Sequence, residues 1–174
     1  YNNNAYRISD ETLHFNGEST LISLQNGGGK SVLVQMLTAP FVHPRYRNTK
    51  DRLFESYFTT NKPSFILVEW ALDQGAGYVL TGLMVRKSQD MEEDRKENLD
   101  IIGIVSEYQS PCIQDIHHLP VVEKGKKEMI LKNFNSCRQL FETYKKDRDM
   151  KFFYYDLTNY AQSRQYFNKL MEYQ

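Results

Sequence analysis

The stretch Leu24-Gln25-Asn26-Gly27-Gly28-Gly29-Lys30-Ser31 predicts more about the fold than any other part of this sequence. Three consecutive glycines allow positive φ angles and leave the backbone N–H groups open to a ligand. Lysine and serine follow directly, and the apolar run 32–37 comes next. A glycine loop that leads through Lys-Ser into a helix is typical of sites that bind nucleotide phosphates.

Each part of this loop has an expected role. The N–H groups would surround phosphate oxygens, and the following helix would add its dipole. Lys30 would contact the β and γ phosphates, and the Ser31 hydroxyl would bind magnesium. We expect the ligand to be ATP with Mg²⁺, bound through Asn26, Gly27, Gly28, Gly29, Lys30, Ser31 and Val32. The general pattern has another glycine where Leu24 stands, so the turn into the loop is irregular.

The surrounding sequence predicts a single α/β domain over residues 1–174. The strongest strand patterns are 65–72 and 78–85, which flank a turn at 74–77 and form an antiparallel hairpin. We expect a mixed sheet, in part antiparallel, and a P-loop fold of the type found in nucleotide triphosphatases. The other expected strands are 12–15, 19–24, 101–105, 119–122 and 151–155, and the expected helices are 31–37, 51–58, 128–144 and 161–173.

Composition excludes several functional classes. The formal net charge is zero, so no overall field attracts the chain to nucleic acid or to a membrane. Two cysteines form no disulfide framework and are typical of a reducing cytoplasm. No apolar run reaches the roughly 18 residues that a membrane-spanning helix needs. We therefore expect a cytoplasmic protein without a membrane segment.

A basic segment follows the expected loop helix. Its cations are Arg45, Arg47, Lys50 and Arg52. Three interpretations stay open: contact with DNA phosphates, contact with the nucleotide, or an ordinary solvated surface. A contact with DNA phosphates would weaken as the salt concentration rises.

The loop resembles the Walker A motif of SMC-type ATPase heads, and in particular those of the MukB branch. Segments 46–49 and 166–171 and the hairpin 65–87 are also similar to parts of MukB-type heads. Within this group, the resemblance extends to MukB-like subunits of bacterial plasmid-defence systems of the Wadjet type. The resemblance covers most of the chain, but only the glycine loop is highly specific.

This resemblance implies that the chain is the N-terminal part of a head. The C-terminal half of the same head would carry the signature motif, the Walker B aspartate and the catalytic glutamate, with coiled coil between the halves. ATP would join the head to a second copy, acting on DNA in chromosome or plasmid organisation, with kleisin-like accessory subunits. ATPase activity would belong to the complete protein, so this part has no catalytic residues of its own. The alternatives are a compact P-loop enzyme such as a small-molecule kinase, and a nucleotide-gated binding module without catalysis.

Other candidate residues are weaker. Glu69 and Asp156 each end an apolar run as a Walker B aspartate does, but a structural role is the better interpretation of both. Gln162, Gln165 and Gln174 compete for the role of a magnesium-sensing glutamine. The zinc-binding residue types Cys112, His117, His118 and Cys137 do not have the spacing of a common zinc site.

Overall fold

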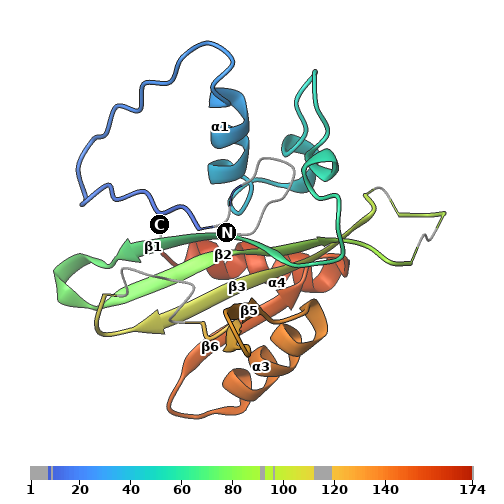
Figure 1. The fold of residues 1–174 in the computed structure, drawn as a ribbon. Helices are drawn as coiled ribbons and strands as arrows, with labels where there is room; N and C mark the ends of the chain where they lie inside the picture. Colours follow the sequence, from blue (N-terminus) through green and yellow to red (C-terminus); the bar gives the residue numbers. More distant parts are fainter. Residues whose placement is uncertain (1–7, 9, 91–92, 96, 112–118, 174) are drawn as a thin grey trace.

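The core of the protein is a four-stranded sheet with the order β1-β2-β3-β6 (Figure 1). The computed structural model describes residues 8, 10–90, 93–95, 97–111 and 119–173. The strands of the sheet are β1 (Ser64–Ala71), β2 (Tyr78–Lys87), β3 (Leu99–Tyr108) and β6 (Lys151–Asp156). With the three α-helices of the described residues, the sheet makes a mixed α/β structure.

The predicted hairpin is confirmed. β1 pairs with β2 along its whole length, from Ser64 opposite Val85 to Ala71 opposite Tyr78, and a short 3₁₀ turn at Asp73–Gly75 connects them. Both strands are rich in β-branched, aromatic and other apolar residues, which pack well on a pleated surface. β2 and β3 are the most buried strands, because each has another strand on both sides.

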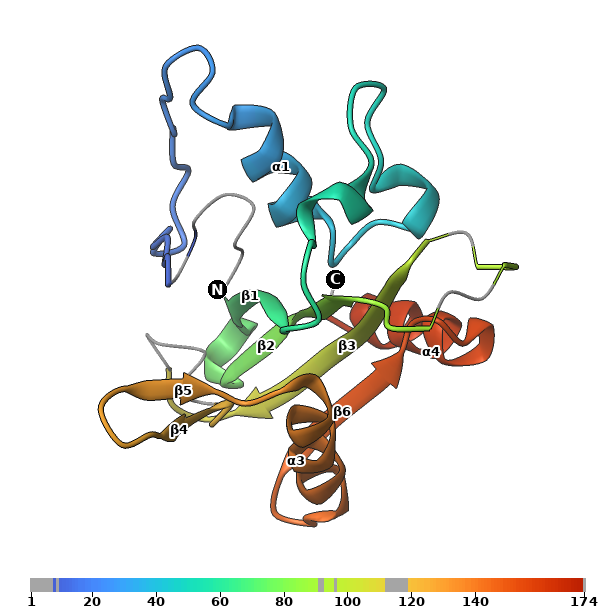
Figure 2. The same ribbon diagram turned by 45° about the vertical axis from the view of Figure 1, so that its right-hand side comes forward.

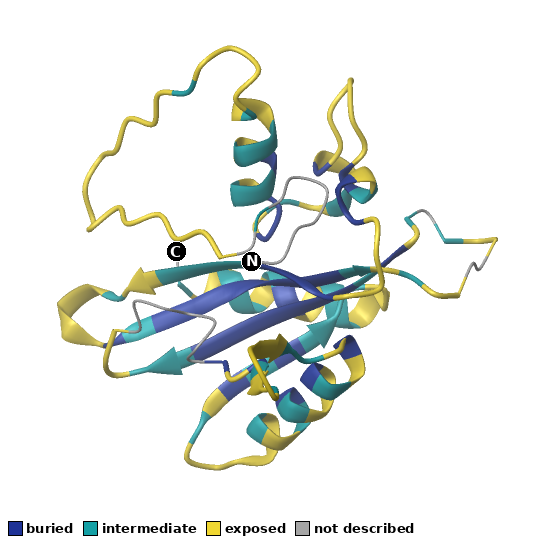
Figure 3. Ribbon diagram, in the orientation of Figure 1, coloured by how far each residue is buried: buried dark blue, intermediate teal, exposed yellow. Residues whose placement is uncertain are grey.

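Helices cover both faces of the sheet. α3 (Phe134–Lys146) and the small hairpin of β4 (Val122–Lys124) and β5 (Met129–Leu131) pack on one face. α4 (Tyr160–Met171) and the C-terminal part of α1 (Lys30–Thr38) pack on the other. The burial pattern in Figure 3 follows this arrangement, with buried residues concentrated in the central strands. None of the described helices has both the length and the apolar character needed to cross a bilayer.

The predicted helix after the glycine loop is confirmed as α1, which ends two residues before Pro40. Its apolar side contacts a cluster that includes Phe54, Tyr57 and Phe58. The expected helix 51–58 is a single 3₁₀ turn at Phe54–Tyr57. This segment runs beside α1 and fixes the lower end of that helix against the sheet (Figures 1 and 2).

The strands expected at 12–15 and 19–24 do not form. Residues 10–23 are exposed, and the side chain of Leu21 keeps 94% of its accessible surface. Only the turn between the two segments is present: the N–H of Glu18 donates to the carbonyl of Phe15 at 2.9 Å. Asn16 and Gly17 both have positive φ angles, as in the type I′ turn of hairpins. The two arms have no neighbouring strand to pair with among the described residues, and without pairing an amphipathic segment has no reason to become a strand.

Two further expectations are corrected. The described sheet is antiparallel at every pairing and not mixed, since none of the described residues before the glycine loop forms a strand. The expected helix 128–144 divides into β5 and α3. Asn133 causes the division, because its side-chain oxygen accepts from the N–H of Ser136 and begins α3.

Candidate functional site

The glycine loop lies at the exposed end of α1, away from the sheet (Figure 2). Gly27 has φ 80° and Gly29, the N-cap of α1, has φ 82°, in the region that side-chain-bearing residues rarely adopt. Gly28 has no room for a side chain, because a Cβ there would lie 2.9 Å from the carbonyl oxygen of Gln25. Each of the three glycines is therefore required by the backbone conformation.

The loop closes around the ammonium group of Lys30. Its Nζ donates to the carbonyl of Leu24 at 2.7 Å, to that of Gln25 at 3.2 Å and to Asn26 Oδ1 at 3.4 Å. Two of these acceptors are backbone atoms, so the residue type at Leu24 does not matter for the contact. Leu24, which stands where the general pattern has a glycine, therefore does not disturb the contacts of the loop with Lys30.

The N-terminus of α1 presents N–H donors that have no partner among the described residues. The first hydrogen bond of the helix runs from the N–H of Leu33 to the carbonyl of Gly29 at 2.9 Å. The N–H groups of Lys30, Ser31 and Val32 precede it and point out of the helix end. No acidic side chain occupies the first turn. The positive end of the helix dipole, three N–H groups and the ammonium together form a site suited to an anion with several oxygens.

A magnesium ion would share this site only together with phosphate. Among the described residues, no group of three or more His, Cys, Asp or Glu side chains could hold a metal ion. Ser31 is exposed on the first turn of α1, where its hydroxyl can supply one ligand. Mg²⁺ in nucleotide sites usually takes one or two protein ligands and completes its shell with phosphate oxygens and water. The single hydroxyl is compatible with that arrangement.

The four cations of the basic segment are divided by the fold. Arg45, Lys50 and Arg52 are exposed. The segment 45–52 that carries them lies on the same side of the sheet as the glycine loop (Figure 2). Arg45 stacks over the ring of Tyr46 with 4.5 Å between its guanidinium carbon and the ring centre. These three side chains remain candidates for contact with phosphate.

Arg47 is different, because it is buried and is not available for such a contact. Only 2% of its surface is accessible. Its Nε donates to the carbonyl of Ala39 at 3.0 Å, while Nη2 has no hydrogen-bond partner among the described residues. Burial lowers the pKa of the Arg47 guanidinium, and the nearby Glu97 opposes that shift. The basic pattern of the sequence gives no sign of this, since a buried and an exposed arginine look the same.

Sequence reasoning missed a buried polar network at the lower end of α1. Gln35 donates to the carbonyl of Arg47 at 2.5 Å and accepts from the hydroxyl of Tyr57 at 2.5 Å. Tyr166 of α4 donates to the carbonyl of Pro40 at 2.9 Å. The sequence feature that indicates this network is the single glutamine within the apolar run 32–37. This network joins the helix that carries the loop to the rest of the molecule.

The contacts of the described weaker candidates lie outside the glycine loop. Glu69 accepts from the hydroxyl of Tyr108 at 2.5 Å within the sheet. Asp156 accepts from the N–H of Thr158 at 3.0 Å as a turn residue. Gln162 accepts from the N–H of Asp156 at 2.9 Å, which occupies its side-chain oxygen. Cys137 is buried in the core, where burial raises the pKa of its thiol to about 12. Gln174, Cys112, His117 and His118 lie outside the described residues.

Comparison with known proteins identifies no similar protein. Scans against family models, curated proteins and solved structures each found no match.

Proposed function

We propose that the chain binds the phosphates of ATP, with Mg²⁺, through the loop that ends in Lys30 and Ser31. The observation that carries this proposal is the conformation of the loop. Two glycines with positive φ, a third without room for a Cβ, and an ammonium held against loop carbonyls surround the open end of α1. A bound triphosphate would attract the ammonium away from the carbonyls, because a phosphate oxygen carries more negative charge.

We further propose that this P-loop belongs to the N-terminal part of an SMC/MukB-like ATPase head in the cytoplasm. The bare arms 12–15 and 19–24 support this part of the proposal, because their hairpin turn is formed but their apolar residues are exposed. The C-terminal half of the same head would supply the missing neighbour and the catalytic residues. A second head, DNA at Arg45, Lys50 and Arg52, and kleisin-like subunits are the further partners proposed.

Replacement of Lys30 tests the phosphate site. Lys30→Ala removes the full charge, and a charged hydrogen bond contributes about 1.5–3 kcal/mol. We expect the dissociation constant for a fluorescent ATP analogue with Mg²⁺, measured by anisotropy titration, to rise about 10- to 100-fold. Lys62→Ala is the matched control, because Lys62 is exposed and lies outside the loop. Equal affinity of the Lys30→Ala and Lys62→Ala variants would contradict the proposal.

A further inference from the structure

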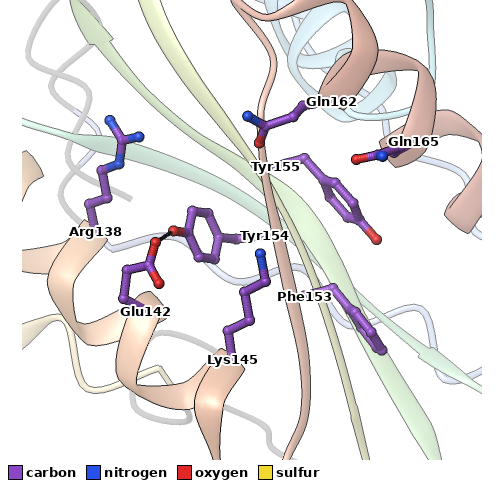
Figure 4. Close-up of a pocket in the computed structure, with 8 residues that line it drawn as sticks. All are labelled: Arg138, Glu142, Lys145, Phe153, Tyr154, Tyr155, Gln162 and Gln165. Atoms are coloured by element: carbon purple, nitrogen blue, oxygen red, sulfur yellow. Dashed lines mark hydrogen bonds between the residues drawn. The ribbon is translucent and has the colours of Figure 1, made fainter.

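A cavity of about 280 Å³ lies between α3 and α4, beside β6 (Figure 4). Its volume is close to the lower end of the roughly 300–1,000 Å³ that small-molecule sites usually have. Three aromatic residues of β6 belong to its lining: the side chain of Tyr154 points toward α3, and those of Phe153 and Tyr155 point toward α4. We call this cavity the α3–α4 pocket.

The two helices present polar side chains to the pocket at helical spacing. Arg138, Glu142 and Lys145 are four and three residues apart, so they share one face of α3. Gln162 and Gln165 are three residues apart and share one face of α4. Gln162 belongs to the first turn of α4, at the positive end of that helix dipole. The pocket therefore has polar groups on two walls, at positions that the helices fix.

Hydrogen-bond donors predominate among these polar groups. Neither Arg138 nor Lys145 forms an ion pair with a described residue. The side-chain oxygen of Gln162 accepts from the N–H of Asp156 at 2.9 Å, which leaves the NH₂ group of this side chain as a donor. The acidic residue of the lining, Glu142, already accepts a hydrogen bond from the hydroxyl of Tyr154. Two cations and an amide donor beside one engaged carboxylate favour an anionic ligand.

The aromatic rings give the pocket an apolar side. Phe153 and Tyr155 are only partly buried, so each leaves part of its ring accessible. Tyr155 packs against Tyr166 of α4 with 6.0 Å between the ring centres, which fixes its position. Lys145 Nζ lies 5.3 Å from the centre of the Tyr154 ring, and this contact directs the ammonium toward β6. A ligand with a ring beside its anionic group would contact both sides of the pocket.

We propose that the α3–α4 pocket binds a small organic anion, a molecule with a single ring that carries a phosphate or carboxylate group. The anionic group would pair with Arg138 and Lys145 and accept from the amide of Gln162, and the ring would lie against Phe153 and Tyr155. A nucleoside triphosphate or a polymer fits less well, because a cavity of about 280 Å³ encloses only a small molecule. The inference is independent of nucleotide binding at the glycine loop.

Amide NMR of the 174-residue chain tests this proposal with three probes of similar size. Phenyl phosphate and benzoate each combine a ring with an anionic group, and benzyl alcohol has the ring without the charge. We expect saturable shifts of the side-chain amide groups of Gln162 and Gln165 with at least one of the anions, and the tighter of the two identifies the preferred group. Benzyl alcohol should bind about tenfold more weakly or less, because it cannot pair with the cations.

Charge-removing variants identify the pocket. Arg138→Gln with Lys145→Gln is expected to weaken binding of the anionic probe about tenfold or more, and both residues are exposed, so the fold should remain intact. Lys146→Gln with Arg148→Gln makes the same change of charge at exposed positions outside the lining, and should change affinity less than about twofold. Absence of saturable shifts with both anions, equal affinity for benzyl alcohol, or equal weakening in the two double variants would each overturn the proposal.

Discussion

Gly82→Ala is expected to lower the free energy of unfolding by about 3 kcal/mol or more. Gly82 lies in the middle of β2, opposite Leu67 of β1 and Ile104 of β3. A Cβ at this position would lie 2.1 Å from the backbone oxygen of Ile66. Because that atom belongs to the neighbouring strand, no side chain can move to relieve the contact. The two strands would have to separate in the buried middle of the sheet.

Gly103→Ala provides the comparison within the same sheet. A Cβ at Gly103 would lie 2.6 Å from the ring of Tyr166, a side chain of α4. Rings can shift, so we expect a smaller loss of about 1–3 kcal/mol, and little further loss in a Tyr166→Ala background. Urea denaturation of the variants measures each difference. If the Gly82→Ala variant were as stable as the wild type, β1 and β2 would not lie as close together at Gly82 as the structure places them.

The second large effect is expected at Gln35. Gln35→Leu keeps the size of the side chain but removes the donor to the carbonyl of Arg47 and the acceptor from the hydroxyl of Tyr57. A buried carbonyl left without its partner costs about 1–3 kcal/mol, and the lost hydroxyl bond about 1 kcal/mol. We therefore expect a total loss of about 2–4 kcal/mol in the free energy of unfolding, measured by urea denaturation.

Two further variants distinguish the loss of this network from the general effect of replacing glutamine by leucine. Tyr57→Phe removes the hydroxyl bond and leaves the bond from Gln35 to the carbonyl of Arg47 in place, so it should lose about 1 kcal/mol. Gln139→Leu makes the same change at an exposed position of α3 and should alter stability by less than about 0.5 kcal/mol. If Gln35→Leu lowered the free energy of unfolding no more than Gln139→Leu does, the network would not stabilise the position of α1. The phosphate loop would then lack the rigid support that the structure gives it.

Strands and helices with strong local patterns were predictable. β1, β2, β3, β6, α1 and α4 lie where alternation or helical periodicity indicates. The strands at 12–15 and 19–24 have equally good patterns, yet a strand also needs a neighbour, and a pattern cannot show whether one exists. The helix predicted over 128–144 follows from apolar residues alone, whereas Asn133 is an N-cap residue type that marks the true start of the helix at Phe134.

The candidate site was predictable to the extent that it is local. The loop and its lysine are contiguous in the sequence, and the expected helix directly follows them. The network of Gln35, Arg47 and Tyr57 joins residues 22 positions apart at its widest, and only the folded chain brings them together.

The most direct test of the central claim is a titration of the isotopically labelled chain with ATP and Mg²⁺, followed by amide NMR. The proposal predicts saturable changes in amide chemical shift that are concentrated at residues 26–32. These changes should be lost in the Lys30→Ala variant. The amides of β6 should not respond, because this strand lies outside the glycine loop. Shifts scattered over the surface, or the same shifts at residues 26–32 in Lys30→Ala, would contradict a phosphate site at this loop.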